Sequence, residues 1–425
     1  MKKALSFLGT GKYNAVTYVW PSLENPEARC RTKLFPIAVY EIFHPDEIVV
    51  FVTQKAKIAK GNEDQKPYLD QLQEKLGVII RPIDIPDGRS VEELWEIFNA
   101  CVSSVETQDE IILDITHAFR SIPMFAFAVA AYLRQTKRIN IKHIVYGAFE
   151  ARQLLDKEEL APVFDLSLLL DLLDWLSATD HFINRGDPMA LGSILFKTKT
   201  NLWKQTKSSR ESIPKFFSKA GGALQDLSRS LCLVQPCQIM ACAQNLTKIL
   251  DKAKEEFEKW ALPFTTILDN VSQAVSSLAY DNPEILDAQN LKVQINIIEY
   301  LLTKGFYMQA VSLAREWVVS WVIWKSGRSE WIKNWKNNKE VREPIEKALG
   351  IALALQKPKK TKYKLPDWFK PLEYKYQLGD IWGWLTNLRN TIDHCGMQKN
   401  VPKINTLENN LKEIPEKIDR LFESL

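Results

Sequence analysis

The sequence lacks any long hydrophobic run. No stretch approaches the roughly 18 consecutive apolar residues that a membrane-spanning helix needs. The apolar run at residues 4–8 is too short for a signal peptide and leads straight into a glycine-containing loop. We therefore expect a cytoplasmic protein without a membrane partner.

Cysteine is also scarce. The six cysteines of the 425-residue chain are too scattered to form a disulfide framework. Cys232, Cys237 and Cys242 are spaced evenly by five, a spacing that no common zinc site uses, and no histidine lies near them. Buried small side chains are the expected role, and no metal cofactor is predicted.

Strong charge of one sign is missing as well. The net charge is +4, so a nucleic-acid interaction must rest on local clusters. What is present is ordinary for a globular protein: 46% apolar and 25% charged residues. A chain of 425 residues exceeds the usual size of one core, which favours two or three domains.

Apolar runs alternate with helical patterns in the first third of the chain. Strands are expected at 3–8, 47–53, 78–83, 110–115 and 141–146, and helices at 65–76, 91–104 and 123–134. Continuous runs of Ile and Val between helices are typical of a mostly parallel sheet that is covered on both faces. The predicted class is α/β, a Rossmann-like domain that binds ligands at the carboxyl ends of its strands.

Two of the expected strands end in loops with functional side chains. The first loop contains Gly9, Thr10, Gly11 and Asn14, but the third glycine of a dinucleotide fingerprint is missing. The second contains Thr116, His117 and Arg120 before a helix that Ser121 and Pro123 would open, an arrangement suited to phosphate. Ordinary turn chemistry accounts for each loop equally well.

Beyond residue 146 the strand signal fades. Residues 151–190 are expected to be connector helices, with an amphipathic segment at 166–176, and residues 191–425 read as helices. Breaks are expected at 221–222, 231–236 and 281–283. A helix at 301–324 carries an apolar stripe flanked by Glu316, which is a candidate supporting residue, although a salt-bridging role is the common case.

Basic and aromatic residues are mixed between positions 325 and 375. This stretch has 14 Lys or Arg against 6 Asp or Glu, with tryptophans and tyrosines interleaved. The mixture suits single-stranded RNA, whose bases stack and whose phosphates need cations. A solubilising surface over core aromatics is the alternative.

The last functional pattern lies near the carboxyl end, in a helix expected at 380–395 that stops at Gly396. Asn390 and His394 are four residues apart and share a face, whereas Arg389 and His394 point in different directions. An ordinary ion pair between Arg389 and Asp393 would also explain part of this pattern.

These motifs resemble a known family. Residues 7–11, 85–98, 114–123 and 146–150 look like the sensor domain of CARF-containing CRISPR ancillary proteins, although Ala118 stands where glycine is usual. Arg389, Asn390 and His394 resemble the Arg-Asn-x-x-x-His motif of HEPN ribonucleases. The combination resembles the CARF–HEPN ribonucleases of type III CRISPR systems, the Csx/Csm-type family.

The resemblance implies domains at 1–150 (CARF), 151–190 (connector) and 191–425, with a HEPN core at about 290–425. It implies a homodimeric endoribonuclease of antiviral defence that cuts single-stranded RNA without a metal. The implied activator is cyclic oligoadenylate, and the resemblance favours the cyclic tetra-adenylate over a ring of six. It also implies that the catalytic residues are Arg389, Asn390 and His394. The ligand-binding residues that it implies are Gly9, Thr10, Gly11, Asn14, Thr116, His117 and Arg120. A CARF regulator, or a ring nuclease that degrades its ligand and dimerises through its helices, stays open as the alternative.

Overall fold

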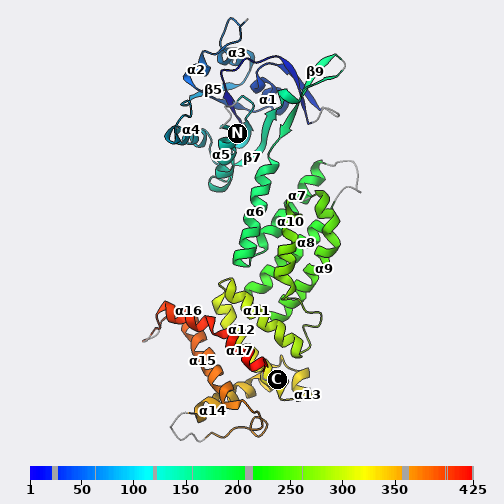
Figure 1. Cartoon of the computed structure of the whole chain (residues 1–425), viewed down its shortest axis with the longest axis vertical. Helices are drawn as coiled ribbons and strands as arrows, with labels where there is room; N and C mark the ends of the chain where they lie inside the picture. The colour runs from blue at the N-terminus through cyan, green and yellow to red at the C-terminus, as the bar shows by residue number, and fades with distance from the viewer. Residues whose placement is uncertain are drawn as a thin grey trace. The chain divides into compact units, whose positions relative to one another are not determined.

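A computed structural model describes residues 1–21, 27–62, 64–117, 122–155, 157–205, 214–260, 262–356, 363–397, 399 and 401–423. The chain divides into two compact units, Met1–Asp174 and Trp175–Leu425 (Figure 1). The helix α6 (Leu168–Arg185) runs across the boundary between them. Within the described residues, no helix is both long and apolar enough to cross a membrane.

The amino-terminal unit is built around one sheet, nine-stranded within the residues that the structure describes, with the order β3-β2-β9-β7-β6-β1-β4-β5 and β8 paired to β9. The strands are β1 (Lys2–Leu8), β2 (Val16–Trp20), β3 (Ala28–Thr32), β4 (Glu47–Val52), β5 (Ile79–Asp84), β6 (Glu110–Asp114), β7 (Asn140–Gly147), β8 (Gln153–Leu155) and β9 (Glu158–Asp165). Strands β5, β4, β1, β6 and β7 are parallel. The predicted α/β class is confirmed.

Helices cover both faces of this sheet. They are α1 (Phe35–Phe43), α2 (Gln54–Lys57), α3 (Tyr68–Lys75), α4 (Val91–Ser103) and α5 (Ile122–Thr136), with a 3-10 turn η1 (Phe149–Ala151). Alternate residues of a strand point to opposite faces. In β4, Val50 packs in the core that α1 and α3 cover, and Phe51 packs in the core that α4 and α5 cover. Both faces are therefore buried, which explains the continuous apolar runs.

The expectation of connector helices over 151–190 is wrong in its first part. Residues 153–155 and 158–165 are the strands β8 and β9, and β9 pairs with both β2 and β7. The hairpin of β2 and β3 and the helix α1 were not predicted either. These strands extend the sheet beyond the parallel part.

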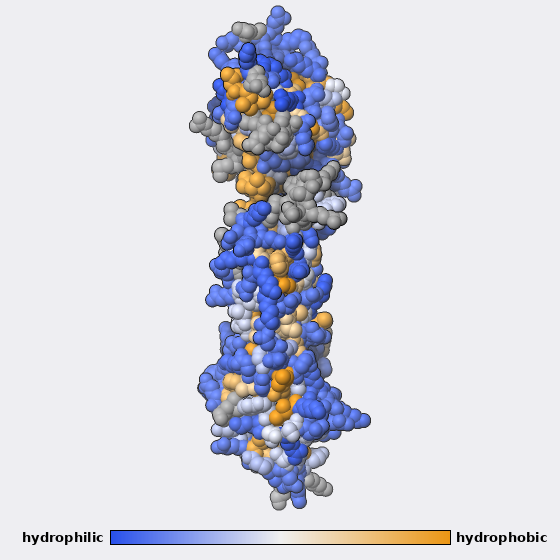
Figure 2. Space-filling model, turned by 90° about the vertical axis from the view of Figure 1, so that its right-hand side faces the viewer, coloured by the Kyte–Doolittle hydropathy of each residue, from blue (hydrophilic) through white to orange (hydrophobic). Residues whose placement is uncertain are grey.

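The second unit is helical throughout its described part. After the end of α6 come α7 (Met189–Gln205), α8 (Phe216–Cys232), α9 (Pro236–Trp260), α10 (Leu262–Ser276), α11 (Ala288–Thr303), α12 (Tyr307–Lys325), α13 (Ser329–Lys333), a π-helical turn η3 (Asn338–Arg342), α14 (Glu343–Leu355), α15 (Lys375–Asp393), α16 (Ile404–Lys412) and α17 (Ile414–Glu423). The face of this unit that Figure 2 shows is largely hydrophilic, with hydrophobic residues in small separate patches.

Two glycine positions correct the expected breaks in this unit. The pair at 221–222 lies inside α8, and Gly221 faces α7 so closely that a Cβ would stand 2.9 Å from the carbonyl oxygen of Gly192. The helix expected at 301–324 is divided at Gly305, which has a φ of +81°. Gly305 therefore separates α11 from α12, and its left-handed backbone is one that favours glycine.

Candidate functional site

The first candidate site lies where two neighbouring parallel strands end. Strand β1 pairs with β4 on one side and with β6 on the other. The helix α1, which precedes β4, and the helix α5, which joins β6 to β7, cover opposite faces of the sheet. Such a switch point leaves a crevice outside the carboxyl ends of the strands. The loops that follow β1, β6 and β7 line a cavity of about 210 Å³ there.

The cavity contains three of the predicted ligand residues: Asn14, Thr116 and His117. The others stand apart from its lining. Gly9 lies beneath it, because a Cβ at this position would be 2.8 Å from the carbonyl oxygen of His117. Thr10 and Gly11 are exposed in the same loop. Arg120, with residues 118–121, falls outside the described residues.

Several cavity residues were missed by the sequence prediction. The lining also includes Lys12, Tyr13, Tyr18, Lys33, Tyr146, Phe149 and Glu150. Lys12, Tyr13, Tyr146, Phe149 and Glu150 lie within segments that the motifs already marked, so proximity in sequence was the available signal. Lys33 and Tyr18 belong to the unpredicted hairpin and α1 region and gave none.

His117 is a fixed neutral group in this cavity. Its Nε2 accepts a hydrogen bond of 3.1 Å from the backbone N–H of Phe35, and its ring lies 3.9 Å from the ring of Tyr13 between centroids. Burial lowers the pKa of His117 to about 4. An acceptor role for Nε2 requires the proton on Nδ1, so the hydrogen bond and the pKa agree.

Asp114, at the end of β6, supports the loop from below. Its Oδ1 accepts a 2.9 Å hydrogen bond from the backbone N–H of Thr116, and the Thr116 hydroxyl accepts one of 2.9 Å from the N–H of Gly147. Burial raises the pKa of Asp114 to about 6. The carboxylate and hydroxyl thus fix two of the three loops, leaving the cavity open between them.

The second candidate site is the end of α15. Gly379 and Gly383 let this helix lie against α14, because a Cβ on Gly379 would stand 2.7 Å from the backbone nitrogen of Leu353. His394 is the C-cap residue, and Gly396 has the left-handed backbone that was predicted, with a φ of +71°. The helix ends one to two residues before the predicted position.

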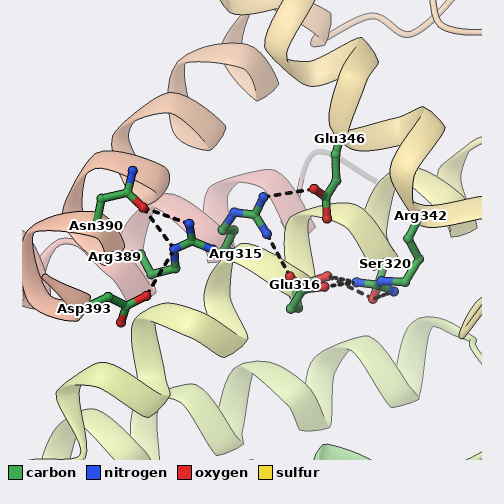
Figure 3. A network of polar contacts seen from close by, with 8 residues as sticks. All are labelled: Arg315, Glu316, Ser320, Arg342, Glu346, Arg389, Asn390 and Asp393. Atoms are coloured by element: carbon green, nitrogen blue, oxygen red, sulfur yellow. Dashed lines mark hydrogen bonds and ion pairs between the residues drawn. The ribbon is translucent and has the colours of Figure 1, made fainter. Parts of the chain in front are cut away.

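The α15 residues are partly brought together. Figure 3 shows Arg389 held by its own helix: Nη2 donates to Asn390 Oδ1 at 2.8 Å, and Nε lies 3.4 Å from Asp393 Oδ2. The ion pair weighed from the sequence is present. Within the described residues, no hydrogen bond or ion pair joins the exposed imidazole of His394 to Arg389. One protomer therefore presents an oriented guanidinium and a separate solvent-facing imidazole.

Glu316, on α12, lies in a network of ion pairs that joins α12 to α14 and to the η3 turn. Its carboxylate meets Arg315 Nη1 at 2.9 Å and Arg342 Nη2 at 2.7 Å, and Arg315 also donates to Glu346 at 3.1 Å (Figure 3). The Arg315 guanidinium lies 3.9 Å from the ring centroid of Trp382 on α15. Glu316 thus contacts the α15 helix through Arg315, and its supporting role stays a prediction.

The basic stretch divides between core and surface. Trp335 is buried, whereas the rings of Trp331 and Trp368 pack edge to face beneath the guanidinium of Arg328. Residues 357–362, the most basic part, lie outside the described residues. No group of three or more histidine, cysteine or acidic side chains that could hold a metal ion occurs in the described part of the chain.

A mostly parallel sheet with a polar cavity at its switch point defines the first unit as a Rossmann-like ligand-binding domain. Residues 3–150 match the family model of the CARF domain of the CRISPR system endoribonuclease Csx1. Residues 171–280 match the second domain of the CRISPR-associated protein MJ1674. The amino-terminal unit thus contains a CARF domain, and the segment that follows it resembles a domain of a CRISPR-associated protein.

Two further likenesses are more limited. The CRISPR-associated protein MJ1674 of Methanocaldococcus jannaschii is 33% identical over 111 residues, which are 25% of this chain and 17% of that protein. The chain therefore spans about a sixth of this relative's length. The structure of Enterococcus italicus Csm6 bound to cyclic hexa-2'-fluoro-hexa-dAMP aligns with 100% of this chain and 94% of that one, at 11% identity and a TM-score of 0.47. A likeness at that score carries no inference about activity.

Proposed function

We propose that the chain is a metal-independent endoribonuclease that cuts single-stranded RNA when cyclic oligoadenylate, most simply the cyclic tetra-adenylate, occupies the β1–β6 cavity. The observation that carries the proposal is the pairing of a CARF domain with the Arg389-Asn390 couple and an exposed His394 at the end of one helix. The cavity supports the sensor part, and the α15 residues support the nuclease part.

The cavity is suited to an anionic nucleotide ring. Lys12 and Lys33 line it, and Lys33 is ion-paired with Asp64, so Lys12 is the lysine more open to a phosphate. Aromatic rings of Tyr13, Tyr146 and Phe149 also line the cavity, and Asn14 offers an amide. Aromatic faces bind adenine bases, and lysines neutralise phosphates. A ring with twofold symmetry would meet two such cavities in a homodimer, each through the same residues.

The proposed cleavage uses the RNA's own 2′-hydroxyl as nucleophile. The 2′-oxygen bonds to the adjacent phosphorus, the bond to the 5′-oxygen breaks, and the products are a 2′,3′-cyclic phosphate and a 5′-hydroxyl. One proton leaves the nucleophile and one reaches the leaving oxygen, the work of an imidazole such as His394. Arg389 stabilises the charged intermediate, and Asn390 holds its guanidinium.

A single protomer supplies one such histidine, and its imidazole does not contact Arg389. We infer that two copies of the chain pool Arg389 and His394 across a twofold axis. The ligand would activate this arrangement only by binding the active form of the dimer more tightly than the inactive form.

The test is to incubate the purified chain in EDTA with labelled single-stranded RNA, with and without cyclic tetra-adenylate, and to score both molecules for cleavage. The proposal predicts RNA cleavage that depends on the ligand. Cleavage of the ligand alone would identify a ring nuclease, and cleavage of neither would leave a ligand-binding regulator.

A further inference from the structure

The helical unit contains a second cavity, of about 490 Å³, that the proposed nuclease site does not use. It lies among the start of α9, the helices α11 and α12, and the segment from Trp335 to Arg342. Gln235, Gln238 and Gln294 bring three amide side chains to its wall, and Trp335 and Leu313 supply apolar surface. Small-molecule sites in proteins commonly have this size and this mixture.

The charges around this cavity cancel in pairs. Arg342 is buried, and its Nη atoms donate to Glu316 Oε2, to the hydroxyl of Ser320 and to two backbone carbonyls. Lys336 forms an ion pair with Glu284 at the rim. A phosphate or carboxylate would have to break these pairs to gain a cation, so the cavity favours a ligand part without charge.

Gln294 has an unused acceptor in the cavity wall. Its side chain is 2% exposed, and Nε2 donates to Asn290 Oδ1 at 2.7 Å. Within the described residues, no hydrogen bond to Oε1 is found. This oxygen is not among the fully buried polar atoms that lack a partner, so it faces the open space of the cavity, where a ligand N–H can donate to it. Gln235 and Gln238 add exposed amides with donors and acceptors of both kinds.

We propose that this cavity binds a nucleobase. A base is uncharged and planar, and its edge carries donors and acceptors side by side, the pattern that amide side chains read in RNA and DNA. The base could belong to a free nucleoside or to a single-stranded RNA. The RNA case rests on the proposed function, and the nucleoside case does not.

The position of the cavity fits a base of the proposed substrate. Glu316 lines it and contacts Arg315, whose guanidinium stacks on Trp382. Arg389 follows Trp382 by seven residues on the same face of α15, a rise of about 10 Å along the helix axis. An RNA strand that places one base in the cavity would carry a phosphate within a few nucleotides of Arg389.

Cys237 provides a reporter inside the cavity. Its thiol lines the wall, half-buried, with Sγ 3.1 Å from the carbonyl oxygen of Pro283. Cys232, the last residue of α8, is exposed and is not part of the lining. Alkylation by N-ethylmaleimide would be timed at both cysteines by peptide mass spectrometry. The probes are adenosine, guanosine, cytidine, uridine and a single-stranded RNA, the last with the Arg389→Ala chain.

We expect at least one nucleoside, or the RNA, to slow alkylation of Cys237 by about threefold or more while Cys232 keeps its rate. Equilibrium dialysis with the protecting probe then tests the residues. Gln294→Met should weaken binding by about fivefold, the usual effect of losing one hydrogen bond. Ser312→Phe fills the cavity and should abolish binding, and Gln273→Met, on the exposed side of α10, should change nothing.

The outcomes separate this proposal from the nuclease. Unchanged Cys237 rates with every probe, or full binding by the Ser312→Phe chain, would overturn the nucleobase site. Protection by RNA without any cleavage by the wild-type chain would uphold the site and count against the nuclease. Protection by nucleosides alone would identify a free nucleoside as the ligand.

Discussion

The cavity of the amino-terminal unit and the end of α15 each present a histidine, and the protein holds the two in different ways. His117 is enclosed, stacked on Tyr13, and accepts a backbone N–H at Nε2. His394 caps a helix, with its side chain in solvent. Burial depresses the pKa of His117 to about 4, so His117 stays neutral and serves shape and hydrogen bonding.

This difference separates a cavity whose loops are joined within one protomer from a proposed reactive site whose residues stand apart in one protomer. Asp114, Thr116 and Gly147 already connect the loops of the cavity. At the end of α15, Arg389 is oriented by Asn390, but its histidine stands apart. In the proposed function, a second copy of the chain completes that arrangement.

The largest expected effect comes from the reactive site. Arg389→Ala and His394→Ala should each lower RNA cleavage by about 10²-fold or more, since positioned proton transfer and charge stabilisation contribute factors of this size. Affinity for cyclic tetra-adenylate should not change. Cleavage rates and calorimetric titrations of the full chain would measure both.

Two surface substitutions serve as matched controls. Arg420→Ala removes an exposed guanidinium that is paired with Glu416 on its own helix, and His181→Ala removes an exposed imidazole on α6. Both should keep wild-type cleavage. Loss of activity in these controls would show that the Arg389 and His394 effects are not specific.

A smaller effect is expected from breaking the contact beneath the cavity. Gly9→Ala places a Cβ 2.8 Å from the backbone oxygen of His117, so the two loops must separate. We expect about a tenfold loss of affinity for cyclic tetra-adenylate, which corresponds to about 1.4 kcal/mol and lies within the roughly 1–3 kcal/mol typical of overpacking. Gly77→Ala, where a Cβ meets nothing within 4 Å, is the control. Equal affinities in titrations of both variants would refute the packing argument.

Two neighbouring glycines in α8 test whether helix packing in the second unit is independent of ligand binding in the β1–β6 cavity. Gly221→Ala would push on the Gly192 carbonyl and should destabilise the helical unit by about 1–3 kcal/mol. Gly222→Ala points into open space and should stabilise the helix by about 0.5–1 kcal/mol. Thermal unfolding would resolve opposite shifts of the transition, and a common direction would contradict the structure. Neither variant should alter ligand affinity.

The smallest predicted effect is a pH dependence inside the cavity. The imidazole of His117 should stay neutral down to about pH 5, with its proton on Nδ1, in nitrogen-15 NMR spectra. Below about pH 6.5 the unfolded chain binds a proton there that the folded chain refuses, so acidification toward pH 4 lowers the stability of this unit. Titration of His117 near its ordinary pKa of 6.5 would disprove the buried, neutral assignment.

Asp114 acts in the opposite direction. Its folded pKa of about 6 lies above the ordinary 3.8, so between these values the folded chain binds the extra proton and acidification stabilises it. Asp114→Asn should therefore make the amino-terminal unit lose stability more steeply between pH 6 and pH 4 than the wild type. Hydrogen exchange of peptides from β1 and β6 would report this locally.

The sequence was sufficient to predict the strands that are buried on both faces of the sheet. Strands β1, β4 and β6 were predicted because each is a continuous apolar run, which only a doubly covered sheet requires. Strand β9 was missed because charged residues and Pro162 interrupt its pattern. Its pairing with β2 and β7 is a tertiary contact that no local pattern reveals.

The same limit applies to the sites. The ion pair of Arg389 with Asp393 follows from helical spacing, so the sequence was enough to raise it. Lys33 reaches the cavity only because α1 and the hairpin fold beside it, and Arg342 reaches Glu316 across 26 positions. Depth of burial at His117 also depends on elements that are remote in sequence.

The most direct test titrates cyclic tetra-adenylate into the wild-type chain in EDTA and follows the initial rate of cleavage of a labelled single-stranded RNA. The account predicts a saturable rise in rate that requires higher ligand concentrations in the Gly9→Ala chain and is absent in the His394→Ala chain. An RNA cleavage rate that is the same at every ligand concentration would contradict it.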